Sequence, residues 1–286
     1  MLRRILDAHG GGLPDDVHVI FANTGKERTE TLDFVRECAE RWNVRIRWIE
    51  WRLLRTDVVA ESTAPRWLRA IDGDAGAVAF PFVRHKWTET CAEVDYERAS
   101  RKGEPFEALI RWKQYLPNMV QRICTQHLKI EAMKAFIVDT LKLDEWDAYI
   151  GIRYDEPRRW RIIGKDKRNP RETKFAPLVQ AKVTESDVLS FWKAQTFDLK
   201  LKSHEGNCDL CFMKGQQKLD RILRANPELA AWWIEQESNR YGKRAGGGKF
   251  RADRPGYLKM LTTAQSQTLL PGFNESDGGI DCNCTD

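Results

Sequence analysis

The stretch Val17-His-Val-Ile-Phe-Ala-Asn-Thr-Gly-Lys-Glu-Arg-Thr-Glu30 decides the fold of this chain. Its first residues, Val17 to Phe21, form a short apolar run rich in β-branched residues, which favours a buried strand of a parallel sheet. Asn23-Thr24-Gly25 then interrupts the run, and Gly25 can adopt a positive φ that lets the backbone approach a ligand closely. From Leu32 to Trp42 apolar residues recur at helical spacing. A strand, polar turn and helix in this order place the turn at the ligand-binding edge of an open sheet; an ordinary βα connection is the alternative.

The residues after this unit continue the alternation of strands and helices. Val44 to Trp48 alternates between apolar and charged residues, which predicts a second strand and hence a right-handed β-α-β unit. Residues 51–103 show no regular pattern, so we expect an irregular segment with helical pieces there. Thr184 and Asp187 have the spacing of a capping box at a helix start. Further elements are expected at residues 2–9, 104–116, 125–141, 183–195, 214–224 and 227–241 (helices) and 147–153 (strand).

These elements predict an α/β fold with an open, mostly parallel sheet flanked by helices. The sheet is expected within a nucleotide-binding domain over residues 1–200, followed by a helical segment over residues 201–286 that carries cysteines. The chain of 286 residues has seven cysteines, no apolar run long enough to cross a membrane and no signal peptide at its start. We therefore expect a cytoplasmic protein without a membrane partner, in which clustered cysteines indicate a metal site or redox chemistry rather than disulfides.

Positive charge is concentrated in two segments of the chain. Residues 153–174 contain nine basic and four acidic residues, and residues 240–254 contain six basic residues and one acid. Arginines that directly follow a predicted strand suit a phosphate-bearing ligand or a nucleic acid, because the guanidinium binds phosphate oxygens in pairs. The alternative is a solvated basic surface.

The motif Cys208-Asp-Leu-Cys211 lies in a predicted loop before a helix, where two thiolates can chelate one metal centre. Cys282 and Cys284 stand in an acidic tail with few apolar residues, and a metal that pins this tail is the simplest explanation for them. A structural zinc site formed by Cys208, Cys211, Cys282 and Cys284 is one possible ligand set.

The sequence Phe21-Ala-Asn-Thr-Gly-Lys-Glu27, followed by Glu30-Thr-Leu32, resembles the phosphoadenosine phosphosulfate (PAPS) reductase family of the adenine-nucleotide α-hydrolase-like superfamily. Gly151-Ile-Arg-Tyr-Asp-Glu-Pro-Arg-Arg159 is similar to the Gly-Leu-Arg-Arg-Asp loop of that family. Cys124 and Lys129 match a Cys-Cys pair and a following lysine, with Thr125 in place of the second cysteine. Cys208 and Cys211 match a Gly-Cys-x-x-Cys motif. The resemblance runs from about Met1 to Gly215.

The resemblance implies that an adenine nucleotide or sulfonucleotide binds at the sheet edge. Its binding residues would be Asn23, Thr24, Gly25, Glu27, Lys129, Gly151, Arg153, Asp155, Arg158 and Arg159. It also implies a [4Fe–4S] cluster held by Cys124, Cys208, Cys211 and either Cys282 or Cys284, as the alternative to zinc.

Several functions are compatible with this resemblance. A sulfonucleotide reductase would use a tail cysteine, Cys282 or Cys284, as the nucleophile and a thioredoxin-like thiol as reductant. The tail, however, matches the Glu-Cys-Gly-Leu-His sequence of such reductases poorly. A cluster-dependent sulfur transferase would instead cleave ATP at the α-phosphate. A metal-stabilised nucleic-acid-binding module without turnover is the non-enzymatic alternative.

The chain lacks the strand and Ser-Gly-Gly-x-x-Ser loop that precede the first helix in this family. We expect the natural product to begin upstream of Met1, with the additional strand in the middle of the sheet beside Val17–Phe21. Without that strand the edge would expose unpaired backbone groups.

Overall fold

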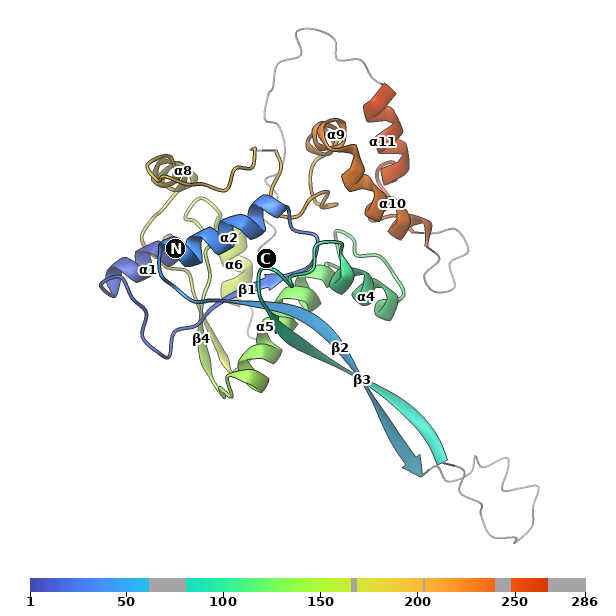
Figure 1. Cartoon of the computed structure of the whole chain (residues 1–286), viewed down its shortest axis with the longest axis horizontal. Helices are drawn as coiled ribbons and strands as arrows, with labels where there is room; N and C mark the ends of the chain where they lie inside the picture. Colours follow the sequence, from blue (N-terminus) through green and yellow to red (C-terminus); the bar gives the residue numbers. More distant parts are fainter. Residues whose placement is uncertain (62–80, 166–168, 203, 240–247, 267–286) are drawn as a thin grey trace, which may run out of the picture.

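The computed structural model describes residues 1–61, 81–165, 169–202, 204–239 and 248–266. It shows a mixed α/β protein with two small sheets and helices around them (Figure 1). The first sheet has the order β1-β2-β3, and the second pairs β4 with β5. The strands are β1 (Val19–Asn23), β2 (Ile46–Glu61), β3 (Pro81–Val94), β4 (Trp146–Tyr149) and β5 (Glu172–Phe175).

The predicted β-α-β unit is confirmed. The helix α2 (Thr29–Arg41) connects β1 to β2, and the two strands pair in parallel from Val19 opposite Ile46 to Asn23 opposite Glu50. Leu32 of α2 is fully buried and packs in one cluster with Trp48 of β2. The apolar stripe of α2 thus covers the unit, and the register brings the polar residues Asn23 and Glu50 side by side at the carboxyl ends of the strands.

The expected single open sheet is only partly present. β1 and β2 form a parallel pair, as predicted, and β4 forms a second parallel pair with β5, a strand that was not predicted. β2 and β3 are antiparallel, and the described strands form two separate sheets. Among these strands β1 pairs with β2 alone, so one of its edges has no described partner. The additional strand expected beside β1 stays a prediction.

The expectation of an irregular segment at residues 51–103 is wrong for much of its length. β2 continues to Glu61 and pairs with β3 from Trp48 opposite Val94 to Glu61 opposite Pro81, which forms a long ribbon that projects from the body (Figure 1). Where the ribbon leaves the body, Ile49 and Trp51 are buried and Arg52 is half exposed. The consecutive residues Ile49, Glu50 and Trp51 are all buried, so this part of the ribbon lacks the apolar–polar alternation by which a strand is recognised in a sequence.

The remaining helices agree with most of the predicted positions. The predicted capping box is confirmed, because the Thr184 side chain accepts from the Asp187 amide and the Asp187 carboxylate accepts from the Thr184 amide at 2.8 Å. No helix in the described part of the chain is long and apolar enough to span a membrane. The helices are α1 (Leu2–Ala8), α4 (Glu104–Lys113), the continuous η1 (Cys124–Glu131), α5 (Ala132–Ala135) and η2 (Phe136–Thr140), α6 (Pro157–Lys165), α7 (Pro177–Gln180), α8 (Glu185–Lys193), α9 (Gln216–Ala225), η3 (Pro227–Leu229), α10 (Ala230–Ser238) and α11 (Tyr257–Ser266).

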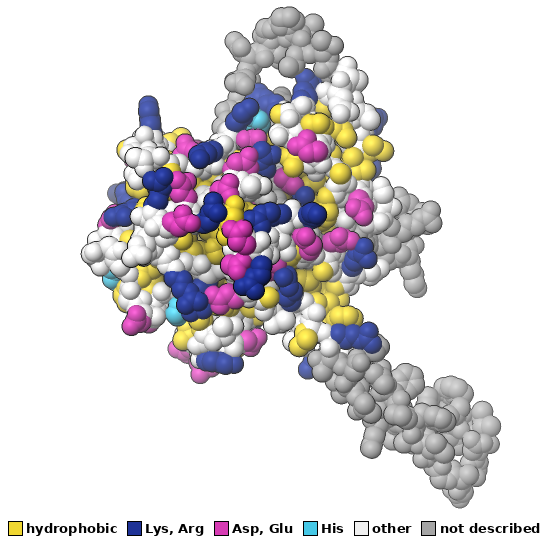
Figure 2. Space-filling view, in the orientation of Figure 1, with side chains coloured by type: hydrophobic (Ala, Val, Ile, Leu, Met, Phe, Trp, Pro, Cys, Tyr) yellow, Lys and Arg dark blue, Asp and Glu magenta, His cyan; other side chains and the backbone are white. Residues whose placement is uncertain are grey.

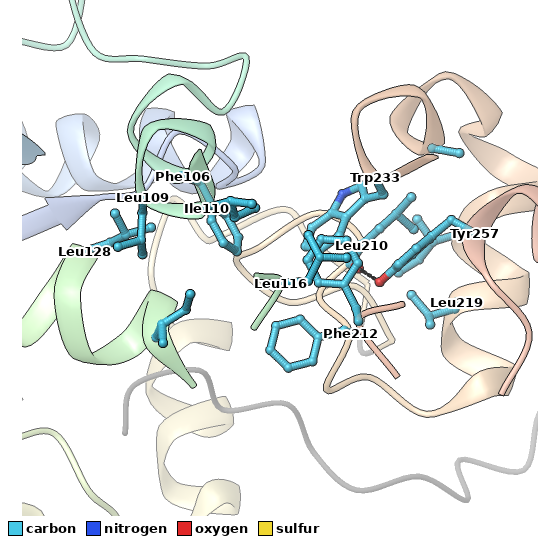
Figure 3. Packing of buried hydrophobic residues seen from close by; sticks show 14 of the residues in the cluster. Phe106, Leu109, Ile110, Leu116, Leu128, Leu210, Phe212, Leu219, Trp233 and Tyr257 are labelled. Atoms are coloured by element: carbon cyan, nitrogen blue, oxygen red, sulfur yellow. Dashed lines mark hydrogen bonds between the residues drawn. The ribbon is translucent and has the colours of Figure 1, made fainter. Parts of the chain in front are cut away.

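One buried apolar cluster joins the sheet to the C-terminal helices. Leu109 and Phe106 of α4 belong to the same cluster as Leu210, Trp233 and Tyr257 (Figure 3). The segment after residue 201 therefore packs into the core of the α/β part and fixes the loop that contains Cys208 and Cys211. Burial of this apolar surface is the main driving force for folding.

Leu109→Ala should lower the free energy of unfolding by about 2–5 kcal/mol, because the residue is 0% exposed and its loss leaves a cavity. Urea unfolding followed by circular dichroism measures the change. Leu189→Ala is the matched control, since Leu189 is 62% exposed and its replacement should change stability by about 0.5 kcal/mol or less. Equal effects of the two substitutions would contradict the assignment of α4 to the core.

Candidate functional site

The turn that follows β1 is buried, and its residues hydrogen-bond to one another. Asn23, Thr24, Lys26 and Glu27 are each less than a tenth exposed. The Thr24 amide and hydroxyl both donate to the Glu27 carboxylate, at 2.9 Å and 2.8 Å. The Gly25 amide donates to Asn23 Oδ1 at 3.1 Å. We call residues 23–28 the turn loop; its hydrogen bonds fix its shape before any ligand binds.

A fully buried carboxylate, Glu50 of β2, anchors the turn loop. It accepts from Asn23 Nδ2 at 2.7 Å, from the Ser100 amide at 2.6 Å and from Arg52 Nη2 at 2.6 Å. Because burial of a carboxylate costs free energy unless it is paired and hydrogen-bonded, these contacts compensate for the burial of Glu50 and hold Asn23 in place. Neither Glu50 nor Ser100 was identified from the sequence. The available signal was an acidic residue between two apolar ones, Ile49 and Trp51, just after the predicted strand Val44–Trp48.

Gly25 approaches the protein's own backbone closely. Gly25 and Gly103 have φ of +80° and +92°, a region that favours glycine. A Cβ on Gly25 would lie 3.0 Å from Pro105 Cδ and 3.2 Å from Gly103 Cα. A Cβ on Gly103 would lie 2.6 Å from Trp232 Nε1. The space beside Gly25, where the sequence suggested a ligand, is therefore filled by Gly103 and Pro105.

A second loop, residues 207–214, runs alongside the turn loop, and we call it the cysteine loop. The Arg28 amide donates to the Asn207 carbonyl at 2.6 Å, and the Asp209 amide donates to the Lys26 carbonyl at 2.9 Å. Glu27 and Cys208 form an antiparallel bridge between these two bonds. The two loops, which are distant in sequence, thus form a short β-like ladder.

A buried ion pair reinforces this ladder. Lys26 Nζ lies 2.7 Å from Asp209 Oδ2, and both side chains are less than a tenth exposed. Trp233 Nε1 donates to Asp209 Oδ1 at 2.9 Å, and the Lys26 ammonium lies 5.1 Å from the centroid of the Trp232 ring. Each charge therefore has polar or aromatic partners inside the protein, which a buried pair requires.

The thiols of Cys208 and Cys211 are in hydrogen-bond contact within the cysteine loop. Cys208 is half-buried and Cys211 is 6% exposed. The hydrogen bond with Cys211, together with burial, raises the pKa of the Cys208 thiol well above its usual value. Lys214, itself buried, donates from Nζ to the carbonyls of Cys208 and Asp209 and so supports the loop from within.

The far side of the cysteine loop is held by α11 and the residues before it. Tyr257 Oη donates to the Leu210 carbonyl at 2.6 Å, which Figure 3 shows as a dashed line. Arg254 donates to the carbonyls of Phe212 and Lys214, both at 2.8 Å. The loop is thus clamped between the turn loop and the C-terminal helices.

The two adjacent thiols fit a pair of neighbouring ligands to one metal centre. Cys124 lies at the start of η1, and its side chain and that of Cys208 pack against the same apolar cluster. Within the described residues no group of three or more His, Cys, Asp or Glu side chains is arranged to hold a metal ion. Cys282 and Cys284 lie outside the described residues. Both the cluster ligand set and the zinc ligand set therefore stay predictions.

Lys129 lies beside the turn loop. Its Nζ is 4.0 Å from Glu27 Oε1, and its side chain is 21% exposed. Because Lys129 belongs to η1, the helix that begins at Cys124 contributes a positive charge at the carboxyl end of β1.

The predicted arginine segment forms a cluster of its own with the start of α8. Arg153 Nε lies 3.0 Å from Asp155 Oδ1, and Arg159 Nη1 lies 2.5 Å from Glu156 Oε1. The Glu185 amide donates to Asp155 Oδ2 at 2.9 Å. The Arg153 guanidinium and the Glu185 amide hold the pKa of Asp155 below its usual value although partial burial opposes this. Two further predicted residues, Gly151 and Arg158, are exposed.

Comparison with known proteins found a distant relative. The chain is similar to an uncharacterized nin region protein, ORF290, of Escherichia phage lambda, with 27% identity over 204 residues. The match covers 71% of this chain and 59% of the phage protein, so the chain spans about three fifths of that protein's length. The sequence matches no known protein-family profile, and no solved structure matches it.

Gly103→Ala should destabilise the protein by about 1–3 kcal/mol, because the new Cβ would lie 2.6 Å from Trp232 Nε1 and 2.9 Å from Lys26 Cδ. Thermal unfolding measures the effect. Gly215→Ala serves as the control, since nothing lies within 4 Å of a Cβ at that position. An unchanged melting temperature for Gly103→Ala would show that the turn loop is not packed as described.

Proposed function

We propose that the protein binds an adenine nucleotide at the carboxyl end of β1, as an enzyme similar to the PAPS reductase family. The observation that supports this best is the convergence of the turn loop, Lys129 and the cysteine loop at one strand end. Ligands of α/β proteins bind outside the carboxyl ends of parallel strands, where the connections diverge. We propose the sulfur of a sulfonucleotide or the α-phosphate of the nucleotide as the reacting centre.

In this proposal Lys129 holds the anionic end of the nucleotide. The amides of Thr24 and Gly25 are already used within the turn loop, so a phosphate or sulfate group requires a side-chain cation. Lys129 meets the Glu27 carboxylate at 4.0 Å, which is long for an ion pair, and a ligand anion at hydrogen-bond distance would compete well with it. The rigid turn loop would position the ligand, and Arg158, exposed on α6, is a further candidate for its anionic groups.

The cysteine loop supplies the reactive group of the proposed site. Cys208 and Cys211 would hold an iron–sulfur cluster or a zinc ion, which would provide a redox-active or Lewis-acidic centre there. The two candidate reactions leave different products. A reductase releases sulfite and requires thioredoxin-like thiols, whereas a sulfur transferase releases AMP and pyrophosphate.

The surface charge gives less support to a nucleic-acid-binding module. Figure 2 shows basic and acidic side chains intermixed on the face that it draws, rather than a basic patch of one sign. Arg153 and Arg159, which the sequence suggested for such a surface, are paired with acidic side chains. The nucleotide site is therefore the main proposal, and the binding experiment described below also tests for nucleic-acid binding.

Lys129→Met should weaken nucleotide binding about 10-fold or more, because a hydrogen bond to a charged group contributes about 1.5–3 kcal/mol. Isothermal titration with ATP, AMP, adenosine 3′,5′-bisphosphate and PAPS measures the affinities. Lys134→Met is the matched control, since Lys134 lies nearby in the same continuous helix and is 44% exposed beside Glu131.

Two results would contradict the proposal. Absence of binding to every nucleotide of the panel would exclude a nucleotide site, and equal affinities of Lys129→Met and the unmodified chain would exclude the proposed position. Salt-dependent binding of RNA or DNA without nucleotide turnover would select the nucleic-acid-binding alternative.

A further inference from the structure

We propose that Lys102 binds a second phosphate group of the nucleotide, at a subsite separate from Lys129. It belongs to the segment Ser100-Arg-Lys-Gly103, which follows β3, precedes α4 and is called the basic loop below. This inference rests on the proposed function and deepens it, because it states that the bound nucleotide carries two phosphate groups rather than one.

The basic loop is fixed to the strand ends at its first residue. The Ser100 amide and hydroxyl donate to the Glu50 carboxylate at 2.6 Å and 2.9 Å. The Ser100 carbonyl accepts from Asn23 Nδ2 at 2.9 Å. Ser100 therefore lies where the parallel pairing of β1 and β2 ends, at Asn23 and Glu50.

The last residue of the basic loop is fixed to the turn loop. A Cβ on Gly25 would lie 3.2 Å from Gly103 Cα, and a Cβ on Gly103 would lie 2.9 Å from Lys26 Cδ. Both ends of the basic loop are thus held against the residues proposed to position the nucleotide. Only Arg101 and Lys102 lie between these ends, so the fold itself sets the main chain of Lys102 beside the proposed site.

The side chains of Arg101 and Lys102 have different surroundings. Arg101 is half-buried and donates to the carbonyls of Ala99 and Tyr96, both at 2.8 Å, so it stabilises the loop from within. Lys102 is exposed, and its amide donates to Glu104 Oε2 at 3.0 Å. In the part of the chain that the structure describes, neither of the two cations forms an ion pair with a carboxylate.

The charge of Lys102 is available to a ligand, unlike that of two neighbouring cations. Arg52 Nη2 lies 2.6 Å from Glu50 Oε2, and Lys26 is buried against Asp209. An exposed ammonium without an ion-pair partner breaks no internal contact when it binds an anion. Its hydrogen bonds to phosphate oxygens are charge-assisted and stronger than those of a neutral donor. A phosphate group is therefore the ligand chemistry that fits this position.

Lys102 and Lys129 reach the turn loop from different elements and at different residues. Lys129 belongs to η1 and lies 4.0 Å from Glu27, whereas Lys102 precedes Gly103, which packs on Gly25. A nucleotide that lies across the turn loop would present one anionic group to each lysine. The group at Lys102 is a 3′-phosphate or a β-phosphate, which share the same chemistry.

The test compares three nucleotides that differ in their phosphate groups. Affinities of Lys102→Met and of the unmodified chain for AMP, ADP and adenosine 3′,5′-bisphosphate are measured by calorimetry. We expect AMP to bind equally to both proteins. ADP, adenosine 3′,5′-bisphosphate or both should bind Lys102→Met about 10-fold more weakly, because a hydrogen bond to a charged group is lost. The nucleotide that loses affinity identifies the second group as the β-phosphate or the 3′-phosphate.

Two further variants separate a ligand contact from a structural role. Lys102→Arg keeps the positive charge and should bind the affected nucleotide more tightly than Lys102→Met does. Lys134→Met removes another lysine, 44% exposed, and should match the unmodified chain with all three nucleotides.

The outcomes separate the subsite from the proposed function. Equal affinities of Lys102→Met and the unmodified chain for all three nucleotides overturn the subsite, and so does an equal loss with AMP. If the unmodified chain binds none of the three, the proposed function fails, and inorganic pyrophosphate then decides the subsite alone. We expect pyrophosphate to raise the melting temperature of the unmodified chain more than that of Lys102→Met, because a bound ligand stabilises the folded state. Equal shifts, including none in either protein, overturn the subsite.

Discussion

The buried ion pair between Lys26 and Asp209 is the contact on which the candidate site depends. It joins a residue near the start of the chain to the centre of the cysteine motif, and the tryptophans Trp232 and Trp233 of α10 surround it. Removal of one partner from a buried pair leaves an uncompensated charge and costs about 3–5 kcal/mol. The pair therefore adds little net stability, but it strongly disfavours any arrangement in which the two loops separate.

Near this pair, a network of hydrogen bonds joins Asn23, Thr24, Glu27 and Glu50 at the carboxyl end of β1. The Glu50 carboxylate accepts a hydrogen bond from the Asn23 side chain, and the Asn23 side chain accepts one from the Gly25 amide. The Glu27 carboxylate accepts a hydrogen bond from the Thr24 amide. These hydrogen bonds make the turn loop rigid, since breaking one of them leaves a buried polar group unsatisfied. The site is thereby preorganised by side chains from β1, β2 and the loop after β3. In the proposed function, this arrangement would let a short turn position the nucleotide although its own amides are occupied.

Local patterns in the sequence predicted the elements whose partners are near in the chain. The parallel pair β1–β2, the helix α2 and the capping box at Thr184 follow from periodicity and spacing, and the loop position of Cys208 follows from its neighbours. The ribbon of β2 and β3 was missed because Ile49, Glu50 and Trp51 are all buried, so the sequence there shows no apolar–polar alternation. Glu50 and Gly103 were missed because their roles arise from contacts with Asn23 and Gly25, which only the tertiary fold brings near.

Hydrogen exchange at the ladder between the two loops tests most directly whether they form one nucleotide site. The informative amides are those of Arg28 and Asp209, which donate to Asn207 and Lys26 across the ladder. Saturating adenosine 3′,5′-bisphosphate or ATP should slow exchange at both amides and in η1 around Lys129, because a ligand that binds there stabilises the closed ladder against local opening. Protection confined to residues 153–159, or unchanged exchange at both amides with nucleotide bound, would contradict the account.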